Sequence, residues 1–140
     1  MIRAVILDDE TKGSSLLEHK INALEVTVQV VKIFNNAQLA LAEIKELEVD
    51  VLFLDVEMPK LNGFQFLEKL GSFDFEVIFV TAYNEYALDA FRANALDYLL
   101  KPVNPDELET AIRKLKNRLA LKVLSDKTLN PNTKSSTGAK

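Results

Sequence analysis

Three acidic residues directly follow apolar runs of the chain, and their types suit phosphoryl chemistry. Asp8 and Asp9 follow the run at residues 2–7, and Asp55 follows the run at residues 49–54. Carboxylate oxygens are hard ligands that suit Mg²⁺, which prefers octahedral oxygen coordination and keeps several waters. A carboxylate beside such a cation can attack phosphorus, because the positive charge offsets the repulsion between two anions. These residues therefore predict a magnesium site with one aspartyl nucleophile.

Two further residues could bind the oxygens of the phosphoryl group. Thr81 follows the apolar run at residues 77–80, and Lys101 follows the run at residues 98–100. A hydroxyl can donate a hydrogen bond to an anionic oxygen, and an ammonium can form an ion pair with it. We expect the peptide bond between Lys101 and Pro102 to be cis, since a tight bend there would direct the ammonium back over the strand ends.

Five short apolar runs, rich in β-branched and aromatic residues, predict five strands. They stay apolar along their length, which is typical of parallel strands covered by helices on both faces. The sequence therefore predicts an α/β fold, a doubly wound five-stranded parallel sheet of the flavodoxin-like (βα)5 type with strand order 2-1-3-4-5. In such a sheet, the polar residues that end the strands meet at one edge. The predicted strands are residues 2–7, 26–34, 49–54, 77–80 and 98–100.

Apolar residues at helical spacing predict a helix after each strand. The last helix has the clearest start, because Asn104 is a candidate N-cap and Pro105 takes the first helical position. A domain at residues 1–122 and a polar linker or disordered tail at residues 123–140 are expected. The expected apolar faces of the five helices are Leu16, Leu17, Ile21 and Leu24; Leu39, Leu41, Ile44 and Leu47; Phe64, Phe66, Leu67 and Leu70; Ala87, Leu88 and Phe91; and Leu108, Ala111, Ile112, Leu115 and Leu119.

The composition excludes several classes of protein. The 140 residues include 17 Lys and Arg against 21 Asp and Glu, a net charge of −4, which argues against binding nucleic acid by charge alone. The absence of cysteine excludes disulfides and thiol nucleophiles, and a single histidine, His19, excludes multi-histidine metal sites. No apolar run approaches the roughly 20 residues that span a bilayer. A cytoplasmic protein without membrane contact is therefore expected.

Five motifs in order make this chain resemble the receiver domain of two-component response regulators. The resemblance covers about residues 2–121 and is specific because all five motifs occur at matching spacing. Residues 87–103 look most like receivers that precede a LytTR-type DNA-binding domain. The motifs are ILDDE at residues 6–10, LFLDVEMP at residues 52–59, NGF at residues 62–64, TA at residues 81–82 and YLLKP at residues 98–102.

The resemblance implies a role for each residue of the site. Asp55 would be the phosphoacceptor, and Asp9 and Asp55 would bind Mg²⁺ directly. Asp8 would assist through a bound water, and the backbone carbonyl of Glu57 would supply a further ligand.

The resemblance also implies a switch and its partners. Thr81 would hydrogen-bond the phosphoryl group, Lys101 would pair with it, and Tyr98 would rotate inward as Thr81 moves. The phosphoryl group would come from a sensor histidine kinase. From the residues themselves, we expect phosphorylation to promote a homodimer through the surface of the fourth helix, fifth strand and fifth helix. Charges of both signs on that surface could pair across a two-fold axis: Asp89, Arg92, Asp97, Arg113 and Lys114. The domain would not be an enzyme beyond its own phosphorylation and dephosphorylation. It would contact DNA only through an output domain outside these 140 residues, and so regulate transcription.

Other interpretations remain at this point. Asp8 and Asp9 could simply cap the first helix, and Tyr98 alone is most often a core aromatic. A stand-alone receiver would need no output domain. An aspartyl-phosphate phosphohydrolase usually carries D-x-D-x-T, and this chain departs from that pattern after Asp55. A flavin carrier is rejected, because Asp8, Asp9 and Glu10 would repel a phosphate placed after the first strand.

Overall fold

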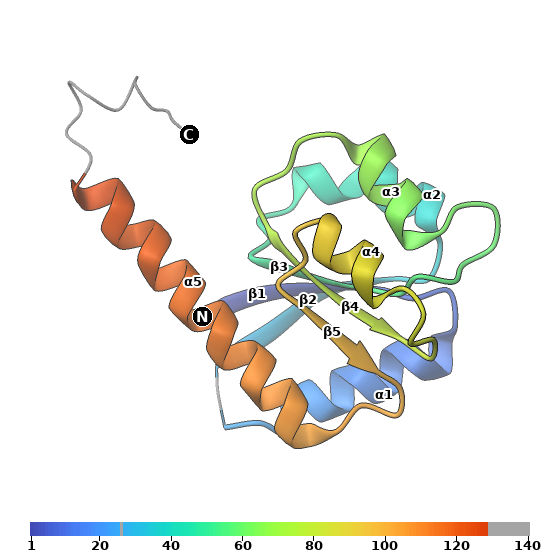
Figure 1. Cartoon of the computed structure of the whole chain (residues 1–140), viewed down its shortest axis with the longest axis horizontal. Coiled ribbons are helices and arrows are strands. Elements are labelled where there is room, and N and C mark those ends of the chain that lie inside the picture. Colours follow the sequence, from blue (N-terminus) through green and yellow to red (C-terminus); the bar gives the residue numbers. More distant parts are fainter. Residues whose placement is uncertain (26, 129–140) are drawn as a thin grey trace.

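The computed structural model describes residues 1–25 and 27–128 and contains one five-stranded parallel sheet. The strand order is β2-β1-β3-β4-β5, so the predicted fold class and strand order are confirmed (Figure 1). β1, β3 and β4 are almost wholly buried, whereas β2 lies at one edge and is partly exposed. The strands are β1 (Ile2–Leu7), β2 (Val28–Phe34), β3 (Val51–Leu54), β4 (Glu76–Thr81) and β5 (Asp97–Leu100).

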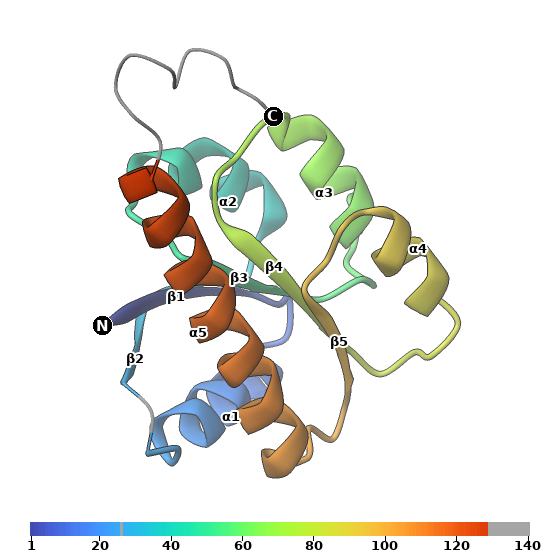
Figure 2. The same ribbon diagram turned by 60° about the vertical axis from the view of Figure 1, so that its left-hand side comes forward.

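Helices cover both faces of this sheet. Figures 1 and 2 show α1 and α5 on one face and α2, α3 and α4 on the other. Alternate residues of β1 serve the two sides: Val5 and Leu7 pack toward α2 and α3, and Ala4 and Ile6 pack toward α1 and α5. The helices are α1 (Thr11–Asn22), α2 (Ala37–Glu43), α3 (Gly63–Leu70), α4 (Ala87–Arg92) and α5 (Pro105–Thr128), and a 3-10 turn, η1 (Ile44–Glu46), follows α2.

Three helices begin at asparagine caps, which satisfy backbone N–H groups that lack a partner within the helix. The side chain of Asn36 accepts a hydrogen bond at the start of α2, and Asn62 forms a reciprocal capping box with Gln65 at the start of α3. Asn104 accepts from the backbone N–H of Asp106 and of Glu107, so its predicted role as the cap of α5 is confirmed.

Helix α5 continues beyond its predicted end. It runs to Thr128 and so enters the segment that was predicted to be a linker from residue 123. Two of its cations hold it to the sheet, because Arg118 and Lys122 both form ion pairs with the buried Glu76 at the start of β4. Residues 129–140 of the predicted tail lie outside the described part, as does residue 26 at the predicted start of β2. Within residues 1–25 and 27–128, no helix is long and apolar enough to cross a bilayer.

Some apolar residues expected on buried helix faces are exposed, and here the prediction was wrong. Leu88 and Phe91 of α4 are 57% and 77% exposed, and the small Ala90 packs into the core in their place. Leu16 of α1 and Leu39 of α2 are also about half exposed. Short helices offer too few turns for spacing alone to fix which face is buried. The consequence is an exposed apolar patch on α4.

Candidate functional site

The three predicted acidic residues meet at the carboxyl edge of the sheet. Leu7 pairs with Leu54 in the register of β1 and β3, so the next residues, Asp8 and Asp55, lie side by side. One carboxylate oxygen each from Asp8, Asp9 and Asp55 lies within 4.8 Å of the others. Asp8 and Asp55 are only 5% and 7% exposed, and Asp9 is half-buried. The expectation that these side chains converge is therefore confirmed.

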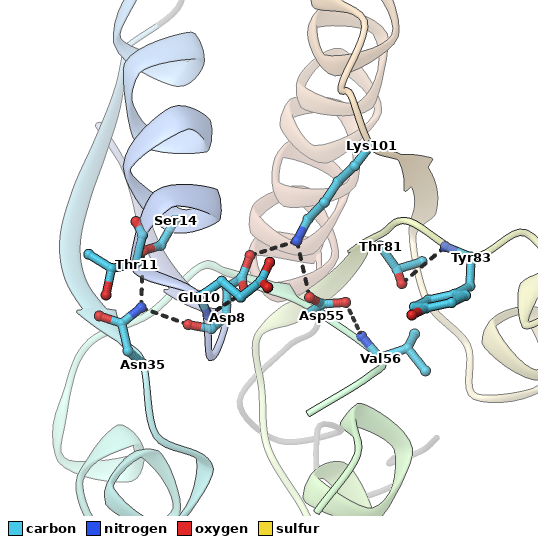
Figure 3. Close-up of polar contacts among 10 residues, drawn as sticks. All are labelled: Asp8, Glu10, Thr11, Ser14, Asn35, Asp55, Val56, Thr81, Tyr83 and Lys101. Carbon is cyan, nitrogen blue, oxygen red and sulfur yellow. Dashed lines mark hydrogen bonds and ion pairs between the residues drawn. The ribbon is translucent and has the colours of Figure 1, made fainter. Parts of the chain in front are cut away.

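Lys101 joins this cluster from the end of β5. Its Nζ lies 2.8 Å from Oδ2 of Asp8 and 3.1 Å from Oδ2 of Asp55 (Figure 3). The peptide bond between Lys101 and Pro102 is cis, as predicted. The backbone N–H of Lys101 also donates to the carbonyl of Thr81, which ties the end of β5 to the end of β4. One ammonium thus bridges two buried carboxylates.

The electrostatics of the cluster favour the arrival of another cation. Burial raises the pKa of Asp55 above its usual range, and the nearby Lys101 ammonium only partly opposes this. Burial and the repulsion from Asp8 and Asp55 also raise the pKa of Asp9. Burial by itself would lower the pKa of Lys101, but its bonds to Asp8 and Asp55 outweigh it and the pKa is raised. Lys101 therefore stays charged, but its single positive charge does not balance the negative charge of three carboxylates.

This set of donors fits a magnesium ion. Three carboxylates within reach of one another provide hard oxygen ligands, and Mg²⁺ needs few of them because it retains waters. The second oxygen of Asp55, Oδ1, accepts a hydrogen bond of 2.7 Å from the backbone N–H of Val56, which fixes the orientation of the carboxylate. Asp8, Asp9 and Asp55 are thus the residues that could hold the metal.

Thr81 and Tyr98 are linked through the loop that follows β4. Thr81 is fully buried, and its Oγ1 lies 3.4 Å from the backbone N of Tyr83, which donates to it (Figure 3). The half-buried Tyr98 of β5 donates its hydroxyl to the carbonyl of the same Tyr83. A displacement of Thr81 would therefore disturb the loop segment that holds the Tyr98 hydroxyl.

Glu57 lies two residues beyond Asp55 and is exposed. Its side chain does not join the acidic cluster; instead, its carboxylate accepts a hydrogen bond from the hydroxyl of Tyr86. The predicted metal ligand at this position is the backbone carbonyl, and that role stays a prediction.

Asn35, at the end of β2, supports the site and was missed by the sequence analysis. Its Nδ2 donates to the backbone carbonyl of Asp8 at 2.6 Å and to Oγ of the buried Ser14 at 3.0 Å (Figure 3). The amide thus fixes the turn that carries Asp8 and Asp9 against α1. The rule that polar residues at strand ends form the site would have found Asn35, because it directly follows β2.

Gly13 and Gly63 also support the site, through the absence of a side chain. A Cβ at Gly13 would lie 2.5 Å from Oδ2 of Asp8, and a Cβ at Gly63 would lie 2.4 Å from the carbonyl oxygen of Asp55. Glycine at these positions therefore lets helices α1 and α3 approach the strand ends without displacing the Asp8 carboxylate or the backbone of Asp55. No local sequence signal marks such a contact, because it depends on how helix and strand pack.

Comparison with known proteins places this arrangement in a family. Residues 4–113 match the model of the response regulator receiver domain. An uncharacterized response regulatory protein of Yersinia pestis is 36% identical over 94% of this chain and 55% of its own length. The transcriptional regulatory protein BtsR of Salmonella typhimurium is 37% identical over 83% of this chain and 48% of its own length. The chain therefore spans about half the length of these relatives.

A solved structure shares the fold. The response regulator TrrA of Thermotoga maritima, solved in complex with Mg²⁺-BeF, superposes with a TM-score of 0.70. The two sequences are 28% identical, and the match covers 82% of this chain and 99% of that one.

The first prediction concerns the repulsion among the carboxylates. Asp9→Asn should stabilise the metal-free protein by roughly 1 kcal/mol or less, because it removes like-charge repulsion from a group that solvent partly screens. The raised pKa values of Asp9 and Asp55 mean that the folded protein retains protons which the unfolded chain releases. Metal-free stability should therefore fall as pH rises from the ordinary carboxylate range through these raised values. Urea unfolding at several pH values measures both effects.

Magnesium should act in the opposite direction over the same pH interval. Since Mg²⁺ binds the deprotonated carboxylates, the stabilisation that it gives to the wild type should grow as pH rises, and Asp9→Asn should largely lose it. Glu68→Gln, which removes one exposed carboxylate from α3, is the control and should respond to Mg²⁺ like the wild type. Equal stabilisation of the wild type and Asp9→Asn by Mg²⁺ would refute this account of the site.

The second prediction concerns Gly13. Gly13→Ala should weaken Mg²⁺ binding, because the new methyl group would displace the Asp8 carboxylate from its place beside Lys101. Helix propensity alone favours alanine by up to about 1 kcal/mol, so helix formation itself should not suffer. Calorimetric titration with Mg²⁺ measures the affinity, and Ser15→Ala, on the exposed side of the same turn, serves as control. Unchanged Mg²⁺ affinity in Gly13→Ala would show that the contact does not matter.

Proposed function

Since the chain belongs to the response regulator receiver family, we propose that it is a phosphorylation-controlled signalling switch whose phosphoacceptor is Asp55. The observation that carries this proposal is the position of the Asp55 carboxylate. It is buried at the end of β3, 3.1 Å from the Lys101 ammonium and within reach of Asp8 and Asp9. A buried carboxylate destabilises the fold unless it forms an ion pair or binds a metal.

The phosphoryl group would come from a phosphohistidine of a sensor histidine kinase, the partner that a receiver domain implies. An oxygen of Asp55 forms the new bond to phosphorus, the phosphorus–nitrogen bond breaks, and its electron pair returns to the imidazole. Asp9, Asp55 and the carbonyl of Glu57 would hold Mg²⁺, with Asp8 assisting through a water. The bound metal would neutralise negative charge on the carboxylates and the phosphoryl oxygens. TrrA, which shares the fold, was solved in complex with Mg²⁺-BeF, and this supports a magnesium-binding role for the acidic cluster.

Lys101 and Thr81 would then recognise the product. The Lys101 ammonium, which now bridges Asp8 and Asp55, would pair with a phosphoryl oxygen, and the Thr81 hydroxyl would donate to another. Tyr98 would follow the movement of Thr81, since both contact Tyr83. The phosphoryl group would thus favour one of two positions of the Thr81 and Tyr98 side chains. In this way a charge at Asp55 would alter the surface around β5.

The output of the switch would be transcription. The relatives named BtsR are transcriptional regulatory proteins, and this chain covers about half of their length. We therefore infer that the receiver controls a LytTR-type DNA-binding domain that lies outside these 140 residues. The receiver domain would catalyse only its own phosphorylation and dephosphorylation. The output domain alone would contact DNA.

The phosphorylated form would dimerise through the face made by α4, β5 and α5. These elements expose three large apolar side chains, Leu88 and Phe91 of α4 and Leu100 of β5, which we call the apolar patch. The ion pair between Lys114 and Asp97 forms within the chain at 3.2 Å. The apolar patch, not this ion pair, is therefore the part of the face that gains most from contact with a second copy.

The third prediction tests the phosphoacceptor. Incubation with acetyl phosphate and Mg²⁺ should add one phosphoryl group to the protein, measured by intact mass. Asp55→Asn should abolish this addition, because an amide oxygen is a far weaker nucleophile than a carboxylate. Asp50→Asn provides a control at an acidic residue that lies at the opposite end of β3. Unchanged labelling of Asp55→Asn would refute the assignment.

The fourth prediction tests the dimer. Sedimentation at high micromolar concentration should show that beryllofluoride, a phosphoryl mimic, converts the monomer to a dimer. Phe91→Ser should weaken that dimer at least about tenfold, the effect of losing one well-buried aromatic contact at an interface. Leu39→Ser, at an exposed leucine of α2 near the β2 edge of the sheet, the edge opposite β5, should dimerise like the wild type. A dimer that is equally weakened by both substitutions, or a protein that stays monomeric, would contradict the proposed interface.

A further inference from the structure

A hydrogen bond joins the two loops that border the phosphoacceptor. The hydroxyl of Tyr86, the residue that precedes α4, donates to the carboxylate of Glu57. Glu57 lies in the loop after β3, two residues from Asp55, and Tyr86 lies in the loop after β4, five residues from Thr81. The bond thus links the loop of the phosphoacceptor to the loop of the switch residue.

Packing fixes the position of the Tyr86 ring. Its centroid lies 6.2 Å from that of Phe64 in α3 and 6.3 Å from that of Tyr83, which meets it edge-on. Phe64 in turn packs on Phe79 of β4, with ring centroids 4.7 Å apart. The ring is therefore held against the framework of the domain, and it is the exposed Glu57 side chain that is oriented by the bond.

The Tyr86 hydroxyl remains a donor at neutral pH. Its hydrogen bond to Glu57, together with desolvation, raises the pKa of Tyr86 to about 12. The carboxylate of Glu57 thus accepts a hydrogen bond on the α4 side and stays outside the cluster of Asp8, Asp9 and Asp55.

Loss of the phosphoryl group by hydrolysis is accelerated when a nearby base accepts a proton from the attacking water. The oxygen of a water forms a bond to phosphorus, and the bond between phosphorus and the Asp55 oxygen breaks. Its electron pair returns to Asp55 as a carboxylate, and a proton of the water passes to a base. Asp8 and Asp9 would face the metal, whereas Glu57 lies two residues from Asp55 and outside that cluster, so its carboxylate could take this proton if it were free to turn.

Resting on the phosphoacceptor role proposed above for Asp55, we propose that Tyr86 is a positioning residue which holds Glu57 away from the hydrolytic water. The hydroxyl of Tyr86 keeps the Glu57 carboxylate turned toward α4, and this prolongs the phosphorylated state. Tyr86 acts through Glu57 and does not touch the phosphoryl group. Its effect should therefore disappear when the Glu57 carboxylate is removed.

The fifth prediction follows from a cycle of variants. The wild type, Tyr86→Phe, Glu57→Ala and the double variant are phosphorylated with acetyl phosphate and Mg²⁺, the donor is removed, and the decay is followed by intact mass. Tyr86→Phe keeps the ring and its packing but loses the hydroxyl. It should shorten the phosphoryl lifetime on the order of fivefold, the size of one ordinary hydrogen bond. In the Glu57→Ala background the same substitution should have no effect. Glu85→Ala, which removes an exposed carboxylate from the same loop, is the control and should match the wild type.

A second readout does not require phosphorylation. Urea unfolding of the same four metal-free proteins should show that Tyr86→Phe and Glu57→Ala are coupled, because each removes one partner of the same bond. Absence of coupling would overturn the proposal, as would equal acceleration of decay by Tyr86→Phe in both backgrounds, or no acceleration in either. A wild type that takes up no phosphoryl group would refute the role of Asp55, while the unfolding cycle would still decide whether Tyr86 positions Glu57.

Discussion

Repulsion among three carboxylates at the carboxyl edge of the sheet is the interaction on which this structure depends. Asp8 and Asp55 are buried, and Asp9 is close enough for one oxygen of each to lie within 4.8 Å of the others. Within the described residues, the Lys101 ammonium is the cation that pairs with this cluster, and it reaches Asp8 and Asp55. Even so, burial keeps the pKa of Asp55 raised. The folded domain therefore holds an unfavourable charge arrangement that a metal ion or a phosphoryl group can change.

The fold supplies what is needed to hold that arrangement. Parallel register places the ends of β1 and β3 side by side, and both strands are almost wholly buried. Asn35 fixes the turn that carries Asp8 and Asp9, and Gly13 and Gly63 let two helices approach the carboxylates closely. The loops after β3 and β4 are more exposed. The Tyr86 hydroxyl donates to Glu57 in the first loop, and the Tyr98 hydroxyl donates to the carbonyl of Tyr83 in the second. A rigid site thus adjoins loops that can respond to it.

The parallel sheet could be predicted from the sequence, because strands that stay apolar along their length are typical of a sheet covered on both faces. The convergence of Asp8, Asp9 and Asp55 followed from it, because the carboxyl ends of parallel strands meet at one edge. Asn104 could be predicted as a cap for a similar reason, since capping is local. The exposure of Leu88 and Phe91 could not, because a helix as short as α4 does not define its buried face. The continuation of α5 past residue 122 was missed because polar composition was taken for disorder, whereas Arg118 and Lys122 hold the helix to Glu76. The bond between Tyr86 and Glu57 depends on two loops meeting, which no local pattern indicates.

A crystal structure of the protein with Mg²⁺ and beryllofluoride would test the central claim most directly. If Asp55 is the phosphoacceptor, beryllium will be bonded to an Asp55 carboxylate oxygen, and Mg²⁺ will be bound by Asp9 and Asp55. The Lys101 ammonium, now 3.1 Å from Oδ2 of Asp55, will have moved to contact a fluoride. Beryllium bonded to Asp8 or Asp9, or a Lys101 that still bridges Asp8 and Asp55 while Asp55 carries no beryllium, would contradict the account.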